Sequence, residues 1–432
     1  MRSTACALLA ALLLAGCVPG RVLTQSWDQF HGDAANSGQI LIGTKPAKET
    51  AVTSVQVGPV AYSSPAFSPD GSVYVATFDK NGAPADNALV RVAGGTSPVV
   101  VHREPLGGQL SSPAVDAKGN VYVAQNTSYH DASHLFGFDS RDARIFDVEL
   151  GREGSALAPP KVLNVGGGAV IFQPYRGGSP VGNHVIVVNE HGTRLADVVA
   201  CQIVVGGSLI GPPSFTVPGL DLGPPYPPEA PVGIRAMQED GRPQHYMVVA
   251  TNSCGIQFYK FTLGATSSIA PVFTSIAFHD TDASLISAPA ISADGQVVIS
   301  DSKKRTTAYD LASGNEKWHY DTSAFVSTVP TLLPFAINFV YVASYDKLTK
   351  LDLGTGAVVG EVGAIGPIDA SPAAAGENIF VSTQSGIFTY GLNLNLIAFT
   401  PLAGGSSSPA IGAAGEVVVA TTDGQLFRFP GP

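Results

Sequence analysis

The chain has 432 residues, of which 45% are hydrophobic and only 13% charged, a balance that excludes a charged disordered polymer. Its 48 glycines and 32 prolines therefore indicate many short core segments separated by turns. The formal net charge is −10 and the basic residues are scattered, so nucleic acid is not an expected partner.

The N-terminus has the pattern of a targeting segment. Arg2 is followed by an apolar run over residues 5–15, which is too short to span a bilayer, so residues 1–16 are predicted to be a signal peptide. The run ends in Leu13-Leu14-Ala15-Gly16-Cys17, which resembles the lipobox of bacterial lipoproteins. This resemblance implies acylation of Cys17; the alternative is a plain secretory signal cut near Gly16, with Cys17 incidental.

A lipidated Cys17 would anchor the chain to a membrane without a transmembrane helix. Val18 stands where many lipoproteins retained in the inner membrane carry Asp. In a host with an outer membrane, we therefore expect attachment there, facing the periplasm. Cys201 and Cys254 would then lie in an oxidising compartment, where they either pair as a disulfide or remain two separately buried cysteines.

The next feature is a repeat in which a small residue and a proline precede a turn and a β-branched run. Successive anchor prolines are 37–53 residues apart except for one interval of 77, which predicts eight blades of four strands each. The long interval predicts an insertion at about 217–245 in blade four. Its proline-rich centre presents Tyr226, either as a partner-contacting loop or as a rigid lid. The anchors are Pro65, Pro113, Pro289, Pro372 and Pro409, with weaker copies at Pro159, Pro212 and Pro330.

The two ends of the chain predict how the ring closes. The eighth repeat stops after its third strand, 425–429, and a spare strand at 52–57 precedes the first repeat. These two strands are expected to pair, which would hide an edge that otherwise promotes aggregation. The fold class is therefore an all-β, eight-bladed propeller of antiparallel blades, with one domain over 51–430 and an N-terminal segment and linker over 17–50.

Two stretches carry a family resemblance. Residues 308–318, from Ala308 through Asp310 and Gly314 to Trp318, resemble the tryptophan-docking motif of quinoprotein alcohol dehydrogenase-like propellers, which have PQQ-type repeats. The stretch from Trp27 to Gly38 is similar to the opening found ahead of the first blade in many such proteins. The resemblance implies structural roles for both tryptophans, because a large aromatic ring buries apolar area while its indole N–H finds a carbonyl.

Some members of this family bind pyrroloquinoline quinone and Ca²⁺ over the propeller axis. This chain has no adjacent cysteines and no clustered acidic motif, so no cofactor, metal site or catalytic residue is predicted from its sequence. The histidines of 130–134 and the acidic residues of 279–282 are expected to lie in solvated loops, because neither segment supplies a full ligand set.

The function that these observations favour is a non-catalytic, membrane-anchored propeller that binds another envelope protein. The resemblance to lipoprotein members of the family makes outer-membrane protein assembly a candidate for its specific form. The alternatives are a PQQ- and Ca²⁺-dependent dehydrogenase and a carbohydrate-binding surface protein. Stoichiometric quinone binding that requires Ca²⁺ would indicate the dehydrogenase, and a glycan array would test carbohydrate recognition.

Overall fold

The computed structural model describes most of the chain from Trp27 to Pro432. The described residues exclude 1–26, 49–51, 61–62, 80–85, 96, 127–130, 153, 178–182, 202, 206–207, 211–230, 252–254, 282, 284–285, 323, 325, 327, 334–337, 364–365, 369 and 406.

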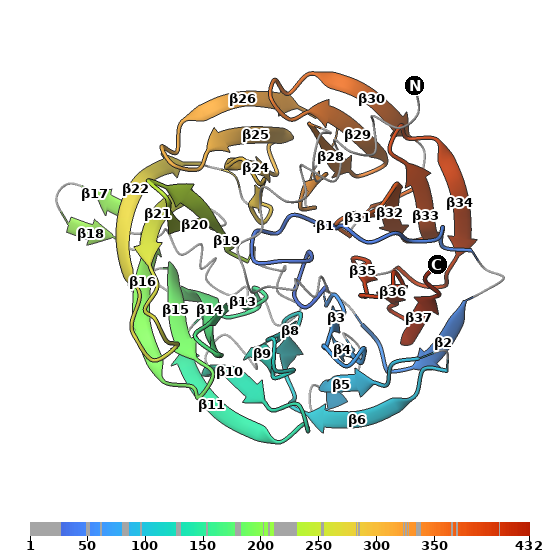
Figure 1. The fold of residues 1–432 in the computed structure, drawn as a ribbon, viewed down its shortest axis with the longest axis horizontal. Coiled ribbons are helices and arrows are strands. Elements are labelled where there is room, and N and C mark those ends of the chain that lie inside the picture. The colour runs from blue at the N-terminus through green and yellow to red at the C-terminus, as the bar shows by residue number, and fades with distance from the viewer. Residues whose placement is uncertain are drawn as a thin grey trace, which may run out of the picture.

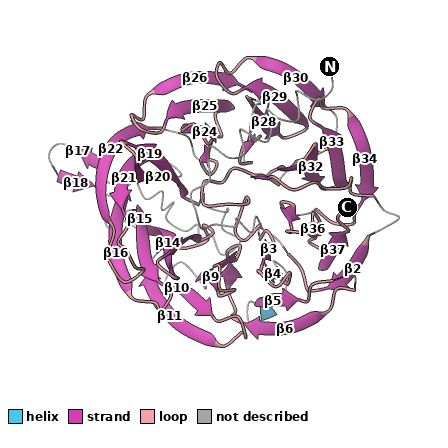
Figure 2. Ribbon diagram, in the orientation of Figure 1, coloured by secondary structure: helices cyan, strands magenta, loops and turns pink. Residues whose placement is uncertain are grey.

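The strands form eight blades arranged in a ring around a central axis (Figures 1 and 2). Each blade has four antiparallel strands, with the shortest strand innermost, as the repeat pattern predicts. Among the described residues, no helix is long and apolar enough to cross a membrane.

The first four blades follow one another in chain order. Blade 1 comprises β3 (Ala66–Phe67), β4 (Val73–Ala76), β5 (Ala88–Val92) and β6 (Val100–Pro105). Blade 2 comprises β8 (Ala114–Val115), β9 (Val121–Asn126), β10 (Ser133–Phe138) and β11 (Arg144–Gly151), with β7 (Gln109–Leu110) added to β9. Blade 3 comprises β13 (Lys161–Val165), β14 (Gly168–Gly177), β15 (Asn183–Asn189) and β16 (Arg194–Cys201), with β12 (Gly154–Ser155) added to β14. Blade 4 comprises β19 (Gly233–Glu239), β20 (Arg242–Thr251), β21 (Gly255–Thr262) and β22 (Val272–Asp280).

The second half of the ring follows the same order. Blade 5 comprises β23 (Ala290–Ile291), β24 (Gln296–Ser300), β25 (Arg305–Asp310) and β26 (Glu316–Asp321). Blade 6 comprises β27 (Thr331–Leu332), β28 (Phe339–Ser344), β29 (Lys347–Asp352) and β30 (Val358–Gly363). Blade 7 comprises β31 (Ala373–Ala375), β32 (Asn378–Thr383), β33 (Gly386–Gly391) and β34 (Leu396–Pro401). Blade 8 comprises β35 (Ala410–Ile411), β36 (Val417–Ala420), β37 (Gln425–Phe429) and β2 (Thr53–Gln56), while β17 (Ile203–Val205) and β18 (Ser208–Ile210) form a separate hairpin.

The predicted closure of the ring is confirmed. Strand β2 pairs antiparallel with β37, in a register that places Val55 opposite Leu426. A strand from the start of the chain thus completes the blade built from its end (Figure 1). The edge that β37 would otherwise expose is covered.

Blade four differs from the sequence prediction. Residues 233–239 form its innermost strand, β19, and β20 begins at Arg242, so residues 233–245 belong to the blade and not to an insertion. Val232 stands where other inner strands are preceded by the anchor proline, which explains why the prediction placed this blade's anchor at Pro212 instead. The remainder of the predicted insertion, including Tyr226, lies almost entirely outside the described residues.

The hydrophobic core is divided into clusters that lie between neighbouring blades. One cluster joins Ala66 and Tyr74 of blade 1 to Val121 and Val123 of blade 2, and the others repeat this pattern around the ring. A larger cluster joins blades 7, 8 and 1 and includes Trp27. Because each blade buries its faces only against its neighbours, the packing between blades holds the propeller together.

Candidate functional site at the propeller axis

Residues Trp27–Gly38 encircle the propeller axis, and we call them the axial ring (Figure 1). Their backbone and side chains hydrogen-bond the inner strand of every blade in the order 8, 1, 2, 3, 4, 5, 6, 7. In each blade the partner is the second residue of the inner strand. The bonds join Trp27 N to Ile411 O (3.2 Å), Phe67 N to Trp27 O (2.7 Å), Val115 N to Asp28 O (2.7 Å), Val162 N to Gln29 Oε1 (3.1 Å), Ile234 N to Ala34 O (2.6 Å), Ile291 N to Ala35 O (2.8 Å), Leu332 N to Ser37 O (2.9 Å) and Ala374 N to Gly38 O (2.8 Å).

After the ring, the chain leaves the axis between blades 7 and 8 (Figure 1). Strand β1 (Gln39–Ile40) pairs parallel with β31, and the Ala47 amide then donates to Thr389 Oγ1 at 3.1 Å. The chain next enters β2 as the outer strand of blade 8. Residues 27–48 were expected to belong to a linker, but they are part of the propeller, because their backbone groups bond its inner strands.

Two glycines allow the ring to turn tightly around His31. Gly32 and Gly38 have φ angles of +93° and +68°, a region that side chains with a Cβ rarely adopt. A Cβ on Gly38 would lie 2.3 Å from His31 Cε1, and one on Gly32 would lie 3.4 Å from the Trp27 ring. Packing against His31 therefore requires glycine at position 38, whereas the positive φ angle favours glycine at position 32.

His31 and Asn36 hold the centre of the ring. The imidazole lies between two carbonyls, with Nδ1 2.7 Å from Asn36 O and Nε2 3.0 Å from Pro372 O. The Asn36 amide donates to Val232 O and Pro289 O, both at 3.0 Å, and so joins blades 4 and 5. Burial lowers the pKa of His31 to about 4, so the imidazole is neutral at physiological pH.

Lys161, the first residue of β13, extends into the ring and is fully buried. Its ammonium donates to Phe30 O at 2.5 Å and to Asp33 O at 2.9 Å. Burial lowers the pKa of Lys161 to about 7 and, on the same principle, raises that of Asp28 to about 7. The centre of the propeller thus contains buried titratable groups, and two of them, His31 and Lys161, contact backbone carbonyls of the protein itself.

Sequence reasoning missed Lys161, although a signal was present. Five other inner strands begin with alanine directly after the anchor proline, whereas blade 3 has Pro160-Lys161 at that position. A cation at a position that otherwise takes a methyl group indicates carbonyl acceptors nearby.

Serines of the repeat line the inner wall, and they act as hydrogen-bonding groups within the fold. The first serine accepts from a β-strand amide thirteen residues later, as Ser63 does from Ala76. The second serine accepts from the preceding blade, as Ser112 does from Ser64 N at 2.8 Å and Ser408 does from Ser371 N at 3.0 Å. These contacts assign the serines a structural role.

The docking motif joins blade 5 to blade 6. The indole of Trp318 is 8% exposed and donates from Nε1 to Leu353 O at 2.8 Å, and a Cβ on Gly356 would lie 2.6 Å from the ring. Asp310 holds the preceding turn by accepting from Ser313 N at 2.9 Å, with Gly314 at φ +73°. Ala308 is opposite Trp318 in the register of β25 and β26.

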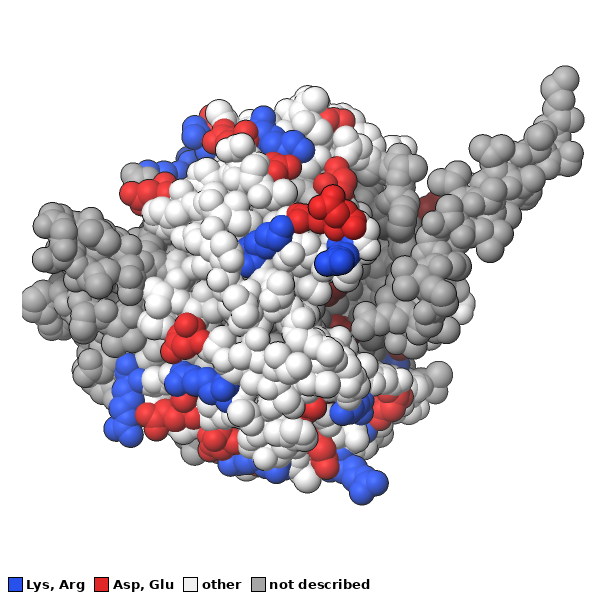
Figure 3. All heavy atoms as spheres, turned by 60° about the vertical axis from the view of Figure 1, so that its left-hand side comes forward, with Lys and Arg blue, Asp and Glu red and all other residues white. Residues whose placement is uncertain are grey.

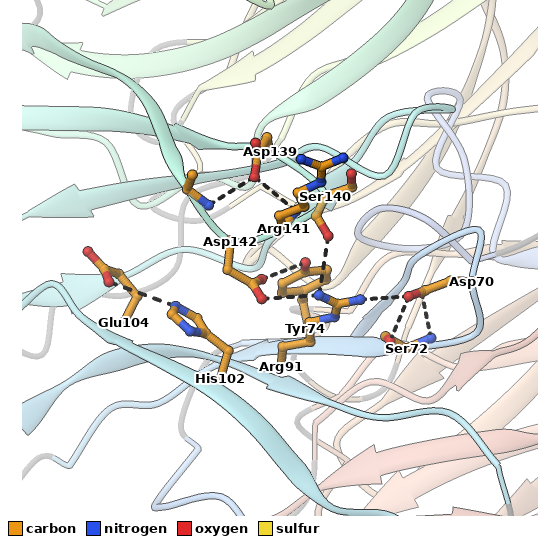
Figure 4. A network of polar contacts seen from close by, with 11 residues as sticks. Asp70, Ser72, Tyr74, Arg91, His102, Glu104, Asp139, Ser140, Arg141 and Asp142 are labelled. Atoms are coloured by element: carbon orange, nitrogen blue, oxygen red, sulfur yellow. Dashed lines mark hydrogen bonds and ion pairs between the residues drawn. The ribbon is translucent and has the colours of Figure 1, made fainter.

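A polar network joins blade 1 to blade 2 (Figure 4). Arg91 donates to Asp70 at 2.6 Å and to Asp142 at 3.0 Å, and the Tyr74 hydroxyl also donates to Asp142. The Arg91 side chain is 17% exposed and that of Asp142 is 12% exposed, so the Arg91–Asp142 contact is largely removed from water. Burial, and then Asp142, raise the pKa of the Tyr74 hydroxyl above its usual range.

The outer surface mixes acidic and basic side chains and shows no patch of one sign in the view of Figure 3. The outer strand of blade 7, β34, differs from this pattern. It has no charged residue, and Leu396, Ile397 and Phe399 are exposed by 57%, 40% and 43%. An apolar outer strand without charges lacks the usual protection against strand pairing.

The side chains of the remaining predicted site residues are not described by the structure. Cys17, Tyr226 and Cys254 lie outside the described residues, as does the side chain of Cys201, so lipidation and the disulfide remain predictions. His134 contacts Asp147 across β10 and β11 at 2.6 Å, away from the ring. No group of three or more His, Cys, Asp or Glu residues able to hold a metal occurs in the described ranges.

Residues 278–430, which span blades 5 to 8, match the family described as outer membrane protein assembly factor BamB. The protein is an eight-bladed β-propeller. Its fold is similar to BamB from Moraxella catarrhalis, with TM-score 0.56, 13% identity, and coverage of 88% of this chain and 97% of that chain. A europium-containing methanol dehydrogenase gives TM-score 0.65, 10% identity, and coverage of 93% and 90%.

A third similar structure is Saccharomyces cerevisiae Sqt1, with TM-score 0.60, 8% identity, and coverage of 91% of this chain and 100% of that chain. A search by sequence among curated proteins finds no match. At these identities the structural likenesses establish the propeller fold and nothing further.

The residues described at the axis do not fit pyrroloquinoline quinone with Ca²⁺. The axial ring binds the inner strands there, and the side chains of Trp27, His31 and Asn36 are 0% exposed. Lys161 donates there to the carbonyls of Phe30 and Asp33, so these oxygens already have a partner, whereas Ca²⁺ requires six to eight oxygen ligands.

Proposed function

We propose that this protein is a membrane-anchored scaffold of the cell envelope that binds another protein through the outside of the propeller, as part of outer-membrane protein assembly. The match of residues 278–430 to the BamB family carries this proposal. The lipobox at Cys17 supports the anchor and the placement at the outer membrane, facing the periplasm.

The exposed side chains of β34 support blade 7 as the place of contact with a partner. The axis is filled by the chain itself, whereas β34 lies within the matched residues and presents Leu396, Ile397 and Phe399 outward. Aromatic and aliphatic side chains on an open strand edge suit pairing with an extended segment of another protein. The partner is therefore expected to dock on blade 7.

Crosslinking in intact membranes, followed by affinity recovery, tests this function. We expect an envelope protein to be recovered with the wild type and to be lost with Phe399→Lys. Val101→Lys is the matched control, because Val101 is 55% exposed on the outer strand of blade 1. Equal recovery with both variants would place the contact elsewhere, and recovery of no protein would contradict the scaffold function.

A further inference from the structure

The axial ring determines where an N-terminal anchor meets the propeller. Trp27, its first residue, is fully buried at the axis between blades 8 and 1, bonded to Ile411 and Phe67. Ten peptide links separate it from Cys17, and a fully extended chain of that length reaches at most about 35 Å. A lipid on Cys17 would therefore hold the propeller close to the membrane by its centre.

The ring also lies nearer to one of the two faces. In blades 1, 2, 5, 6 and 8 the residue bonded by the ring is the last residue of its inner strand, so the ring lies where the inner strands end. The turns from first to second strand and from third to fourth strand lie on this side, for example 68–72 and 139–143. We call it the turn face, and the opposite side, with connections such as 301–304, the loop face.

Because the ring lies nearer the turn face, that face offers the shorter route from Trp27 to the outside of the propeller. The side chains of His31, Asn36 and Lys161 are each 0% exposed, so the centre of the ring is closed. Beyond them, the wall contains buried serines such as Ser64 and Ser112, which bond directly from blade to blade.

We propose that the protein is tethered through its propeller axis, with the turn face toward the lipid surface and the loop face away from it. This inference rests on the lipid anchor of the proposed function. The surface in question is the bilayer that holds the acyl chains, and its headgroups make no specific contact in this arrangement. Blade strands of four to six residues separate the two faces by roughly 13–20 Å, a difference that energy transfer can resolve.

The test uses full-length lipidated protein in phosphatidylethanolamine–phosphatidylglycerol vesicles that carry an energy acceptor on the headgroups. A donor is attached through a genetically encoded azide, replacing either Lys118 on the turn face or Lys303 on the loop face. Both lysines are exposed, so the two substitutions remove the same charge from the surface. We expect transfer from position 118 to be about twofold greater, because the tether is shorter than roughly 35 Å.

A second variant carries an inserted Gly/Ser stretch of roughly ten residues ahead of Val22, which doubles the tether. The difference between positions 118 and 303 should then shrink while vesicle binding persists. Equal transfer, or greater transfer from 303, in the unmodified chain would overturn the orientation, and failure to bind vesicles would overturn the anchor on which it rests. Partner recovery from the same vesicles is measured separately. A protein that binds vesicles in the expected orientation but recovers no partner would contradict the scaffold function and leave the orientation in place.

Discussion

At the scale of single residues, Gly38 is the most constrained position in the axial ring. Its φ angle is +68°, and an added Cβ would lie 2.3 Å from the buried His31 ring. We expect Gly38→Ala to lower the free energy of unfolding by about 2–4 kcal/mol, combining backbone strain with displacement of a buried side chain. Denaturant unfolding measures the loss.

Gly43 provides the matched control for this change. It lies five residues further along the same segment, and a Cβ there would meet nothing within 4 Å. Gly43→Ala should therefore leave stability unchanged or slightly raised. Equal losses in the two variants would mean that the fit around His31 does not constrain the ring.

The pH dependence of His31 gives a second test at this scale. Its folded pKa of about 4 is below the ordinary value of 6.5, so the unfolded chain binds more protons between these limits. The stability that His31 contributes is complete above pH 6.5 and decreases as the pH falls toward 4, by roughly 3 kcal/mol in total.

The measurement compares unfolding of the wild type and His31→Gln across this range. The wild type should lose its advantage over the variant as the pH falls, because glutamine does not titrate. Lys161 lowers the pKa of His31 and Asp33 raises it, but both residues are present in the wild type and in the variant. A difference that stayed constant with pH would contradict the assignment of a neutral, buried His31.

The role of these residues can be predicted from the sequence only where their partners lie nearby along the chain. Trp27 and the spaced glycines were recognisable as a motif, because their order along the chain is characteristic. The contacts of Lys161 were not, since Phe30 and Asp33 lie about 130 residues away in sequence. Only the fold shows which carbonyls the Lys161 side chain meets at the axis.

At the scale of elements, Trp318 tests the joint between blades 5 and 6. Trp318→Phe retains an aromatic ring but leaves Leu353 O without its donor, so we expect a loss of about 1–2 kcal/mol in unfolding free energy. Tyr320→Phe on the same strand removes a hydroxyl bond to the partly exposed Glu361 and should change stability by less than about 0.5 kcal/mol. Comparable losses would show that the indole N–H contributes nothing to the joint.

Strands were predictable because alternation and turn residues are local signals, and the pairing of β2 with β37 followed from counting strands. The inner strand of blade 4 was misplaced because Val232 replaces the proline that marks the other repeats. The path of residues 27–48 was not predicted, because its backbone bonds satisfy strands throughout the chain and leave no periodic pattern.

At the scale of the whole molecule, the axial ring connects blades that would otherwise contact only their neighbours. Repeat folds with nearest-neighbour contacts alone lose cooperativity as units are added. A chain beginning at residue 52 keeps β2 but lacks the ring, and we expect a lower melting temperature and a broader transition in calorimetry.

A synthetic peptide of residues 27–48 should restore much of that stability when added in excess, because the ring's bonds to all eight blades can form between two chains. If the shortened chain does not fold alone, circular dichroism would follow folding on addition of the peptide. A peptide with Asn36→Ala loses the bonds to Val232 and Pro289 and should act only at higher concentration. No effect of either peptide would contradict a linking role.

The axial ring makes a hydrogen bond to the inner strand of each blade, and this correspondence limits how the number of blades can change. Twelve residues, from Trp27 to Gly38, serve eight inner strands in order, so the length of the segment is matched to the circumference of the channel. Duplication of one repeat would enlarge the channel but leave the segment too short to reach every blade. A viable nine-bladed descendant would require two independent genetic events, which favours conservation of blade number even while the outer strands diverge.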